Sequence, residues 1–197
     1  LQEQGLDAPR HLAAITCEGS PLDEQAVREG WVLRLPLWDW VGGRFSITSA
    51  VGLFPAALAG VDTAALLAGA RDMDVWTRQT DPATNPAALL AGAWHLLGHG
   101  RGDRNLAVVP YSDRLRLMGR YLQQLIMESL GKELDRQGAT VRQGLTVYGN
   151  KGSTDQHAYV QQLRDGRDDA LALLVQVLGD GCGSAEPVQG AHRAGDF

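Results

Sequence analysis

The segment "DWVGGRFSITSAVG" (residues 39–52) places two glycines and one arginine between a predicted strand and a predicted helix. Arg44 carries a planar guanidinium that can hold a phosphate, a carboxylate or an enediolate oxygen. Gly42 and Gly43 would let a ligand approach the backbone closely, and a helix N-terminus favours negative charge. The segment therefore predicts an oxyanion site. The alternative is a surface arginine beside a glycine turn, which is the commoner meaning of so short a pattern.

Glu128 and Gln124 lie one helical turn apart in "QQLIMESLGKE" (residues 123–133). The apolar neighbours of Glu128 could partly remove its carboxylate from water, as a general base requires. Gln124 could then hydrogen-bond the same ligand. The alternative is a solvated carboxylate paired with Lys132 at i+4, with Gln124 facing solvent.

His157 lies in "YGNKGSTDQHAYVQQL" (residues 148–163), which predicts a strand, a flexible loop and the first turn of a helix capped by Thr154 or Asp155. A helix N-terminus disfavours a positively charged imidazole, so the neutral ring could accept a proton. The alternative is a capping or core histidine.

Two further histidines, His95 and His99, are spaced as helical metal ligands can be. However, Leu96 occupies the position where that motif needs a glutamate. We therefore predict structural roles for both histidines, and no metal site.

Elements that could position these residues alternate along the chain. The predicted strands are residues 11–16, 31–37, 105–111, 144–149 and 170–178. The predicted helices are residues 21–29, 46–59, 62–79, 86–98, 112–138 and 154–164, with Ser20, Asp62 and Asn85 as N-caps and Gly30 and Gly138 as stops. This order predicts an α/β fold, a three-layer sandwich with a five-stranded, mostly parallel sheet covered by helices on both faces. Ligands of such sheets bind at the carboxyl ends of the strands.

The composition fits one soluble globular domain, with 197 residues, 44% hydrophobic and 21% charged. A net charge of −5 and 6% aromatic residues argue against nucleic acid or an anionic membrane as the main partner. Cys17 and Cys182 lie far apart, and no apolar run is long enough to span a membrane, so we expect reduced thiols in a cytoplasmic protein. The chain begins without Met, and we expect it to be a segment of a longer protein.

Together, the arginine, glutamate and histidine segments resemble the signature sequences of the glucose-6-phosphate isomerase family, in the same order and spacing. The resemblance covers nearly the whole chain. It implies that residues 1–197 form one sugar-isomerase (SIS) domain, the second of two in a longer enzyme that interconverts glucose 6-phosphate and fructose 6-phosphate without metal or organic cofactor.

The resemblance also implies roles for individual residues. Glu128 matches the base that moves a proton between C2 and C1 of the open-chain sugar phosphate, and Arg44, with Gly43 beside it, matches the arginine that stabilises the enediolate. His157 matches the histidine that assists ring opening, which the family takes from the neighbouring subunit of a homodimer. Gln124 matches a substrate-binding glutamine. A base, a cation and a separate acid–base group are what an aldose–ketose isomerisation needs.

Two parts of the family's site have no counterpart here, namely the Ser/Thr-rich phosphate loop of the first domain and the lysine of the C-terminal helix. We therefore expect the isolated chain to be inactive. The alternative function is a non-catalytic sugar-phosphate-binding SIS module or regulator, which would need no base at Glu128.

Overall fold

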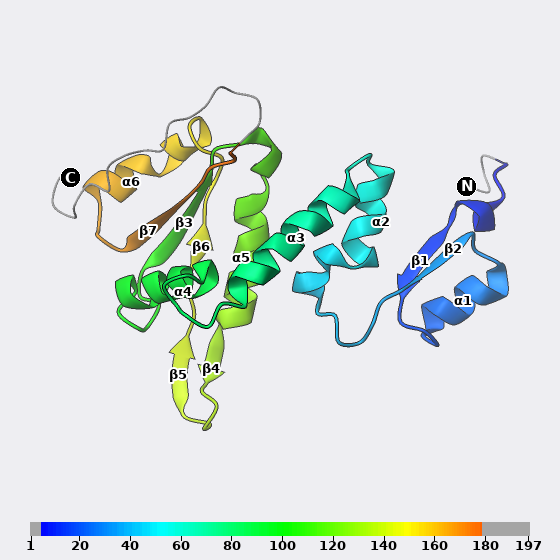
Figure 1. The fold of residues 1–197 in the computed structure, drawn as a ribbon, viewed down its shortest axis with the longest axis horizontal. Helices are drawn as coiled ribbons and strands as arrows, with labels where there is room; N and C mark the ends of the chain where they lie inside the picture. Colours follow the sequence, from blue (N-terminus) through cyan, green and yellow to red (C-terminus); the bar gives the residue numbers. More distant parts are fainter. Residues whose placement is uncertain (1–4, 179–197) are drawn as a thin grey trace. The chain divides into compact units, whose positions relative to one another are not determined.

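The structure, a computed structural model, describes residues 5–178 and divides the chain into two compact units, Leu1–Asp81 and Pro82–Phe197 (Figure 1). Each unit has its own parallel sheet. Cys17 is an exposed free thiol, whereas Cys182 lies outside the described residues.

In the first unit, a helix connects two short parallel strands. β1 (Ala13–Thr16) pairs with β2 (Leu33–Pro36), and α1 (Pro21–Glu29) crosses between them. The predicted ends of α1 are confirmed, because the Ser20 side chain accepts a hydrogen bond from the Asp23 N–H and Gly30 ends the helix in a left-handed conformation. The remaining elements, with 3-10 helices labelled η, are η2 (Ala8–His11), η3 (Gly43–Thr48), α2 (Ala50–Leu58) and α3 (Thr63–Thr77).

The second unit is built around β3 (Asn105–Pro110), which lies between β6 (Val147–Tyr148) and β7 (Ala170–Val175) and runs parallel to both. An antiparallel hairpin is formed by β4 (Lys132–Leu134) and β5 (Thr140–Gln143). The helices of this unit are α4 (Pro86–Leu97), η4 (Asp113–Leu115), α5 (Met118–Leu130), η5 (Asp155–Ala158) and α6 (Val160–Asp165).

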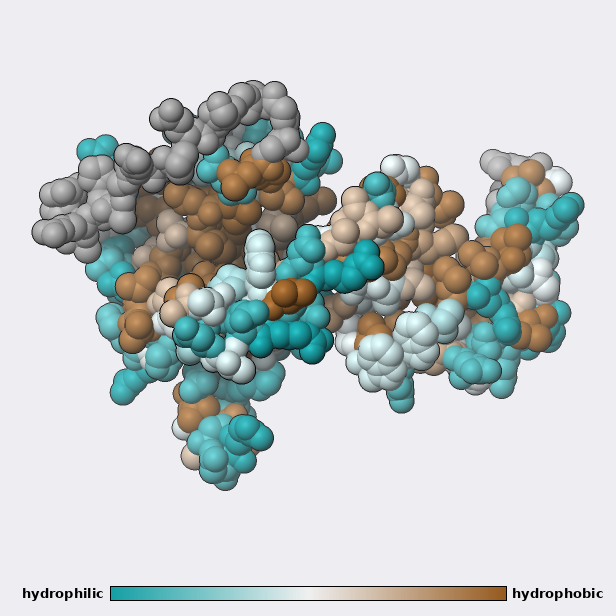
Figure 2. Space-filling model, in the orientation of Figure 1, coloured by the Kyte–Doolittle hydropathy of each residue, from teal (hydrophilic) through white to brown (hydrophobic). Residues whose placement is uncertain are grey.

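The core of the second unit lies between its sheet and α5. It consists of Leu106, Val108, Ile126, Leu145, Val147 and Leu171. β3 is buried along nearly its whole length, as expected of the central strand of a parallel sheet. On β7, however, Leu174 is 64% exposed, so the helices cover the sheet less completely than predicted. Figure 2 shows apolar residues gathered over the body of this unit, whereas the tip of the hairpin is hydrophilic.

The prediction of one five-stranded sheet is wrong for the described residues. All five predicted strands form, and all are parallel to their neighbours, but they hydrogen-bond as a pair in the first unit and as three strands in the second. The segment between β2 and β3 carries η3, α2, α3 and α4, so the two groups of strands are far apart in the chain and belong to separate compact units.

The long helix predicted over residues 112–138 begins only at Met118, after η4, and ends at Leu130, where the β4–β5 hairpin follows it. The reason for the early end is the chemistry of a turn. The Asp135 side chain accepts hydrogen bonds from the N–H groups of Gln137 and Ala139 at 2.8 and 2.9 Å, and Gly138 has a φ of 85°. These residues close a hairpin turn rather than continue a helix. None of the helices within residues 5–178 has both the length and the apolar character needed to cross a lipid bilayer.

Candidate active site

In the first unit, Gly43 and Arg44 begin the short helix η3, which leads directly into α2. Two buried serines fix this junction. The Ser46 hydroxyl donates to the Gly43 carbonyl oxygen and the Ser49 hydroxyl donates to the Ser46 carbonyl oxygen, each at 2.7 Å. A Cβ added at Gly52 would collide with the Ile47 carbonyl oxygen, so η3 also packs tightly on the first turn of α2.

The surroundings of Gly43 are open, because a Cβ at this position would meet no atom within 4 Å. Arg44 is half-buried beside it. A guanidinium on a firmly held backbone, next to a glycine that leaves space, can accommodate an oxyanion. The helix predicted over residues 46–59 forms as a 3-10 helix followed by α2, which begins only at Ala50, and the oxyanion site stays a prediction.

In the second unit, Gln124 and Glu128 lie on the outer side of α5. The Gln124 side-chain amide donates to Glu128 Oε2 at 3.3 Å, and both residues are exposed. The expected partial desolvation of Glu128 is therefore wrong for the described chain. Its apolar neighbours Met127 and Leu130 are themselves 38% and 48% exposed, so they do not shield the carboxylate from water.

His157 is exposed and lies in η5, a four-residue 3-10 turn, rather than in the first turn of an α-helix. Thr154, at the start of η5, forms no side-chain cap, and α6 begins only at Val160. The predicted helix therefore forms in two pieces. The alternative of a core histidine does not apply, because the ring is at the surface.

Side chains outside η5 connect the segment around His157 to the neighbouring strand. The Tyr111 hydroxyl donates to Gln156 Oε1 at 2.9 Å, directly before His157. The Lys151 ammonium pairs with the Asp113 carboxylate at 2.6 Å, and this hydrogen bond lowers the pKa of that carboxyl. These contact residues were not among the functional residues predicted from the sequence. The available signal was a tyrosine immediately after a buried strand, where side chains reach the ligand-binding edge of a parallel sheet.

Two close glycine contacts define the direction of α5 relative to the sheet. Gly119, in the first turn of α5, packs against Gly149 just after β6, since a Cβ at Gly119 would lie 2.7 Å from the Gly149 carbonyl oxygen. Gly131, just after α5, lies beside Gly144, which precedes β6. The helix therefore runs from the carboxyl end of the strands to their amino end (Figure 1).

Glu128 and His157 consequently lie at opposite ends of the sheet. Glu128 is about 13 Å along α5 from Gly119, at a rise of about 1.5 Å per residue, and is near the amino end of the strands. The loop that leads to His157 leaves the carboxyl end of β6. Of these two residues, His157 alone lies at the carboxyl end of the strands, where the sequence predicts ligand binding. Within one chain, these two side chains do not form a common site.

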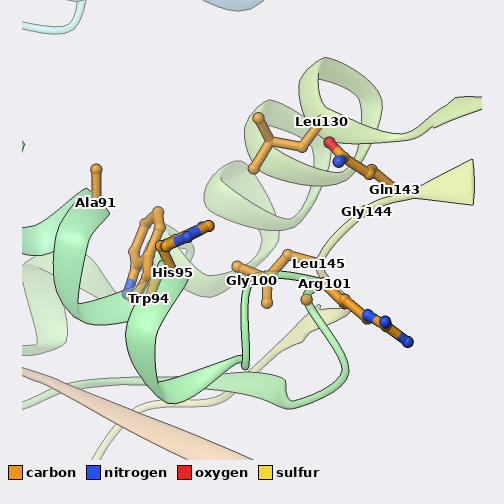
Figure 3. A pocket seen from close by; sticks show the side chains of 10 residues that line it. Ala91, Trp94, His95, Gly100, Arg101, Leu130, Gln143, Gly144 and Leu145 are labelled. Atoms are coloured by element: carbon orange, nitrogen blue, oxygen red, sulfur yellow. The ribbon is translucent and has the colours of Figure 1, made fainter. Parts of the chain in front are cut away.

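A pocket of about 230 Å³ lies beside the end of α5 that carries Glu128 (Figure 3). Its lining includes Trp94 and His95 from α4, Leu130 from α5, and Gln143 and Leu145 from the segment before β6. The pocket is largely apolar, with the His95 ring and the Gln143 amide at its sides.

His95 and His99 have different surroundings. His95 borders the pocket, whereas His99 Nδ1 lies 3.1 Å from Asp103 Oδ2. Among residues 5–178, no group of three or more histidine, cysteine, aspartate or glutamate side chains is arranged to hold a metal ion.

Comparison with known proteins identifies the family of this chain. The sequence matches the phosphoglucose isomerase family over residues 2–170. It is 56% identical to a glucose-6-phosphate isomerase of Geobacter sulfurreducens over 98% of this chain and 36% of that protein. A glucose-6-phosphate isomerase of Synechococcus is 59% identical over 91% of this chain and 34% of that protein.

Comparison with solved structures points to the same family. A glucose-6-phosphate isomerase from Chlamydia trachomatis superimposes with a TM-score of 0.75 at 32% identity, over 88% of this chain and 34% of the other. A hypothetical protein from Thermus thermophilus superimposes with the same TM-score at 39% identity, over 85% of this chain and 39% of the other. The chain belongs to the phosphoglucose isomerase family. It spans about a third of the length of the curated relatives that it matches.

Proposed function

We propose that the full-length protein carrying this chain interconverts glucose 6-phosphate and fructose 6-phosphate. The observation that carries the proposal is the family match over residues 2–170, because this range contains Arg44, Gln124, Glu128 and His157. The names of the curated relatives support the same substrate pair. We further propose that residues 1–197 are the SIS-type part of a longer cytoplasmic isomerase.

In the proposed mechanism, the Glu128 carboxylate removes the proton from C2 of the open-chain aldose phosphate and returns it to C1, while the hydroxyl proton of O2 moves to O1, so that the carbonyl group passes from C1 to C2. The electron pair of the C2–H bond forms an enediolate, whose negative charge the Arg44 guanidinium stabilises. The hydrogen bond from the Gln124 amide to Glu128 supports this proposal, and we propose that Gln124 also binds the substrate. The reaction consists of these two proton shifts, one between carbons and one between oxygens, and we propose that it needs no metal or organic cofactor.

His157 opens and closes the sugar ring in this proposal by exchanging a proton with the ring oxygen. Since Glu128 and His157 lie near opposite ends of the sheet, one substrate could not contact both within one chain. We therefore propose a homodimer in which each site takes Glu128 from one subunit and His157 from the other. Symmetric pairing of two copies produces two such sites.

The test is Glu128→Gln in the full-length protein, measured by exchange of the C2 hydrogen of glucose 6-phosphate with solvent. The amide keeps the shape of the side chain but cannot accept the proton, so exchange should fall by about 10²- to 10⁴-fold while substrate still binds. The matched control is Glu133→Gln, on the exposed strand β4, which should exchange at the wild-type rate.

If the Glu128→Gln variant exchanged the C2 hydrogen at the wild-type rate, Glu128 would not be the catalytic base. If the wild-type protein bound the sugar phosphate without any exchange, the non-catalytic binding module would be the correct function.

A further inference from the structure

The segment that carries His157 has little local structure of its own to hold it. η5 contains four residues, and Thr154 at its start provides no side-chain cap. A 3-10 turn of this length is not stable alone. The position of the His157 ring must therefore depend on contacts with other elements.

Three such contacts connect this segment to the residues at the end of β3. The Tyr111 hydroxyl donates to Gln156 Oε1 at 2.9 Å across 45 positions of sequence. The Gly152 N–H donates to the Pro110 carbonyl oxygen at 2.9 Å. The Lys151–Asp113 ion pair, at 2.6 Å, is the third.

The Tyr111 ring also covers Gly152. A Cβ at this glycine would lie 2.8 Å from two ring carbons, and Gly152 is buried although the ring itself is 46% exposed. Tyr111 thus fixes both sides of the segment, with its ring on the loop before η5 and its hydroxyl on the residue that precedes His157.

We propose that Tyr111 is a positioning residue for the ring-opening step, holding η5 so that the His157 imidazole reaches the ring oxygen of the sugar. This inference rests on the proposed function. Catalytic groups must be held within about 0.5 Å of their productive position, and a displacement of about 1 Å can cost 10²-fold in rate. Tyr111 does not contact the substrate in this proposal; its ring covers Gly152, and its hydroxyl acts through the hydrogen bond to Gln156.

The test compares two substrates of the full-length protein. Glucose 6-phosphate must open its ring before C2 can react, whereas an aldotetrose 4-phosphate has no free hydroxyl with which to close a ring. Tyr111→Phe keeps the ring over Gly152 but removes the donor to Gln156. We expect its kcat on glucose 6-phosphate to fall about 3- to 10-fold, as for the loss of one hydrogen bond, with C2 exchange of the tetrose phosphate unchanged.

Gln156→Ala should reproduce this split, and the double variant should be no slower than either single variant, because both remove the same hydrogen bond. Gln161→Ala, on the exposed face of α6, is the matched control and should leave both substrates unaffected. Equal losses on both substrates, or additive losses in the double variant, would mean a purely structural tyrosine and overturn the proposal.

His157→Asn separates this inference from the proposed function. If His157→Asn slows only the cyclic substrate but Tyr111→Phe slows neither, the role of Tyr111 is wrong and the isomerase assignment stands. If His157→Asn also has no effect, the assignment of His157 to ring opening fails, and the role of Tyr111 fails with it.

Discussion

Arg44 combines a fixed backbone with a half-buried side chain, and its role can be tested by a change that keeps the charge. In Arg44→Lys the ammonium remains, but the planar fork that meets two oxygens is lost. We expect kcat to fall by up to about 10²-fold, with a smaller rise in KM, because the enediolate carries more charge than the substrate. Steady-state kinetics of the full-length protein measures both values.

Arg78→Lys is a suitable control for this prediction, since Arg78 pairs with Asp74 on the exposed surface of α3 and should tolerate the change. A rise in KM with an unchanged kcat for Arg44→Lys would instead assign Arg44 to substrate binding.

At the same scale, the types of the candidate residues could be predicted from sequence, but their surroundings could not. Local patterns predicted an arginine beside two glycines at Arg44 and a glutamate one turn after Gln124, and the order of the segments indicated the family. The exposure of Glu128 could not be predicted, because the same apolar neighbours can lie in a core or at a surface. The contact of Tyr111 with Gln156 joins residues 45 positions apart, which no local pattern encodes.

At the scale of elements, the junction between β6 and the His157 loop depends on a glycine. Gly149 has a φ of 149°, and a Cβ there would collide with the Val108 carbonyl oxygen on β3. We expect Gly149→Ala to destabilise the fold by about 2–4 kcal/mol, because the alanine backbone would be strained at this φ and its Cβ would displace β3. Urea unfolding would show this as a lower midpoint.

The comparison for Gly149→Ala is Gly92→Ala in α4, where a Cβ would meet nothing within 4 Å. That change should be neutral or stabilise by about 0.5–1 kcal/mol, because alanine favours a helix interior. Similar midpoints for the two variants would show that the close approach at Gly149 is not a constraint.

Elements with explicit end signals were predicted well. Asp62 accepts from the Ala65 N–H at 2.9 Å, and Asn85 accepts from two N–H groups at 3.1 Å, as the cap pattern indicates. The prediction that the long helix reaches Gly138 is wrong, because Gly138 was interpreted as the end of the helix although it belongs to the turn set by Asp135. The Asp135 side chain hydrogen-bonds its neighbouring backbone and so favours the turn over a helix.

At the scale of the whole molecule, the five strands of the parallel sheets and their common direction were predictable, but their pairing was not, and the antiparallel strands β4 and β5 were not predicted. Each strand is a short apolar run, and local sequence does not specify which edge it joins. The positions of Glu128 and His157 near opposite ends of one sheet also emerge only in three dimensions. This separation is the physical reason for expecting each active site to need two copies of the chain.

The shared site between subunits can be tested by co-expressing two inactive full-length variants, Glu128→Gln and His157→Asn, with different affinity tags. In a mixed dimer, one site would combine the intact Glu128 of one subunit with the intact His157 of the other, and the second site would carry both changes. We therefore expect about a quarter of the wild-type activity on glucose 6-phosphate in the randomly paired mixture, and about half in the doubly purified mixed dimer. If the doubly purified mixed dimer is as inactive as its parents, Glu128 and His157 do not act at a shared site between subunits, which contradicts the proposed dimeric active site.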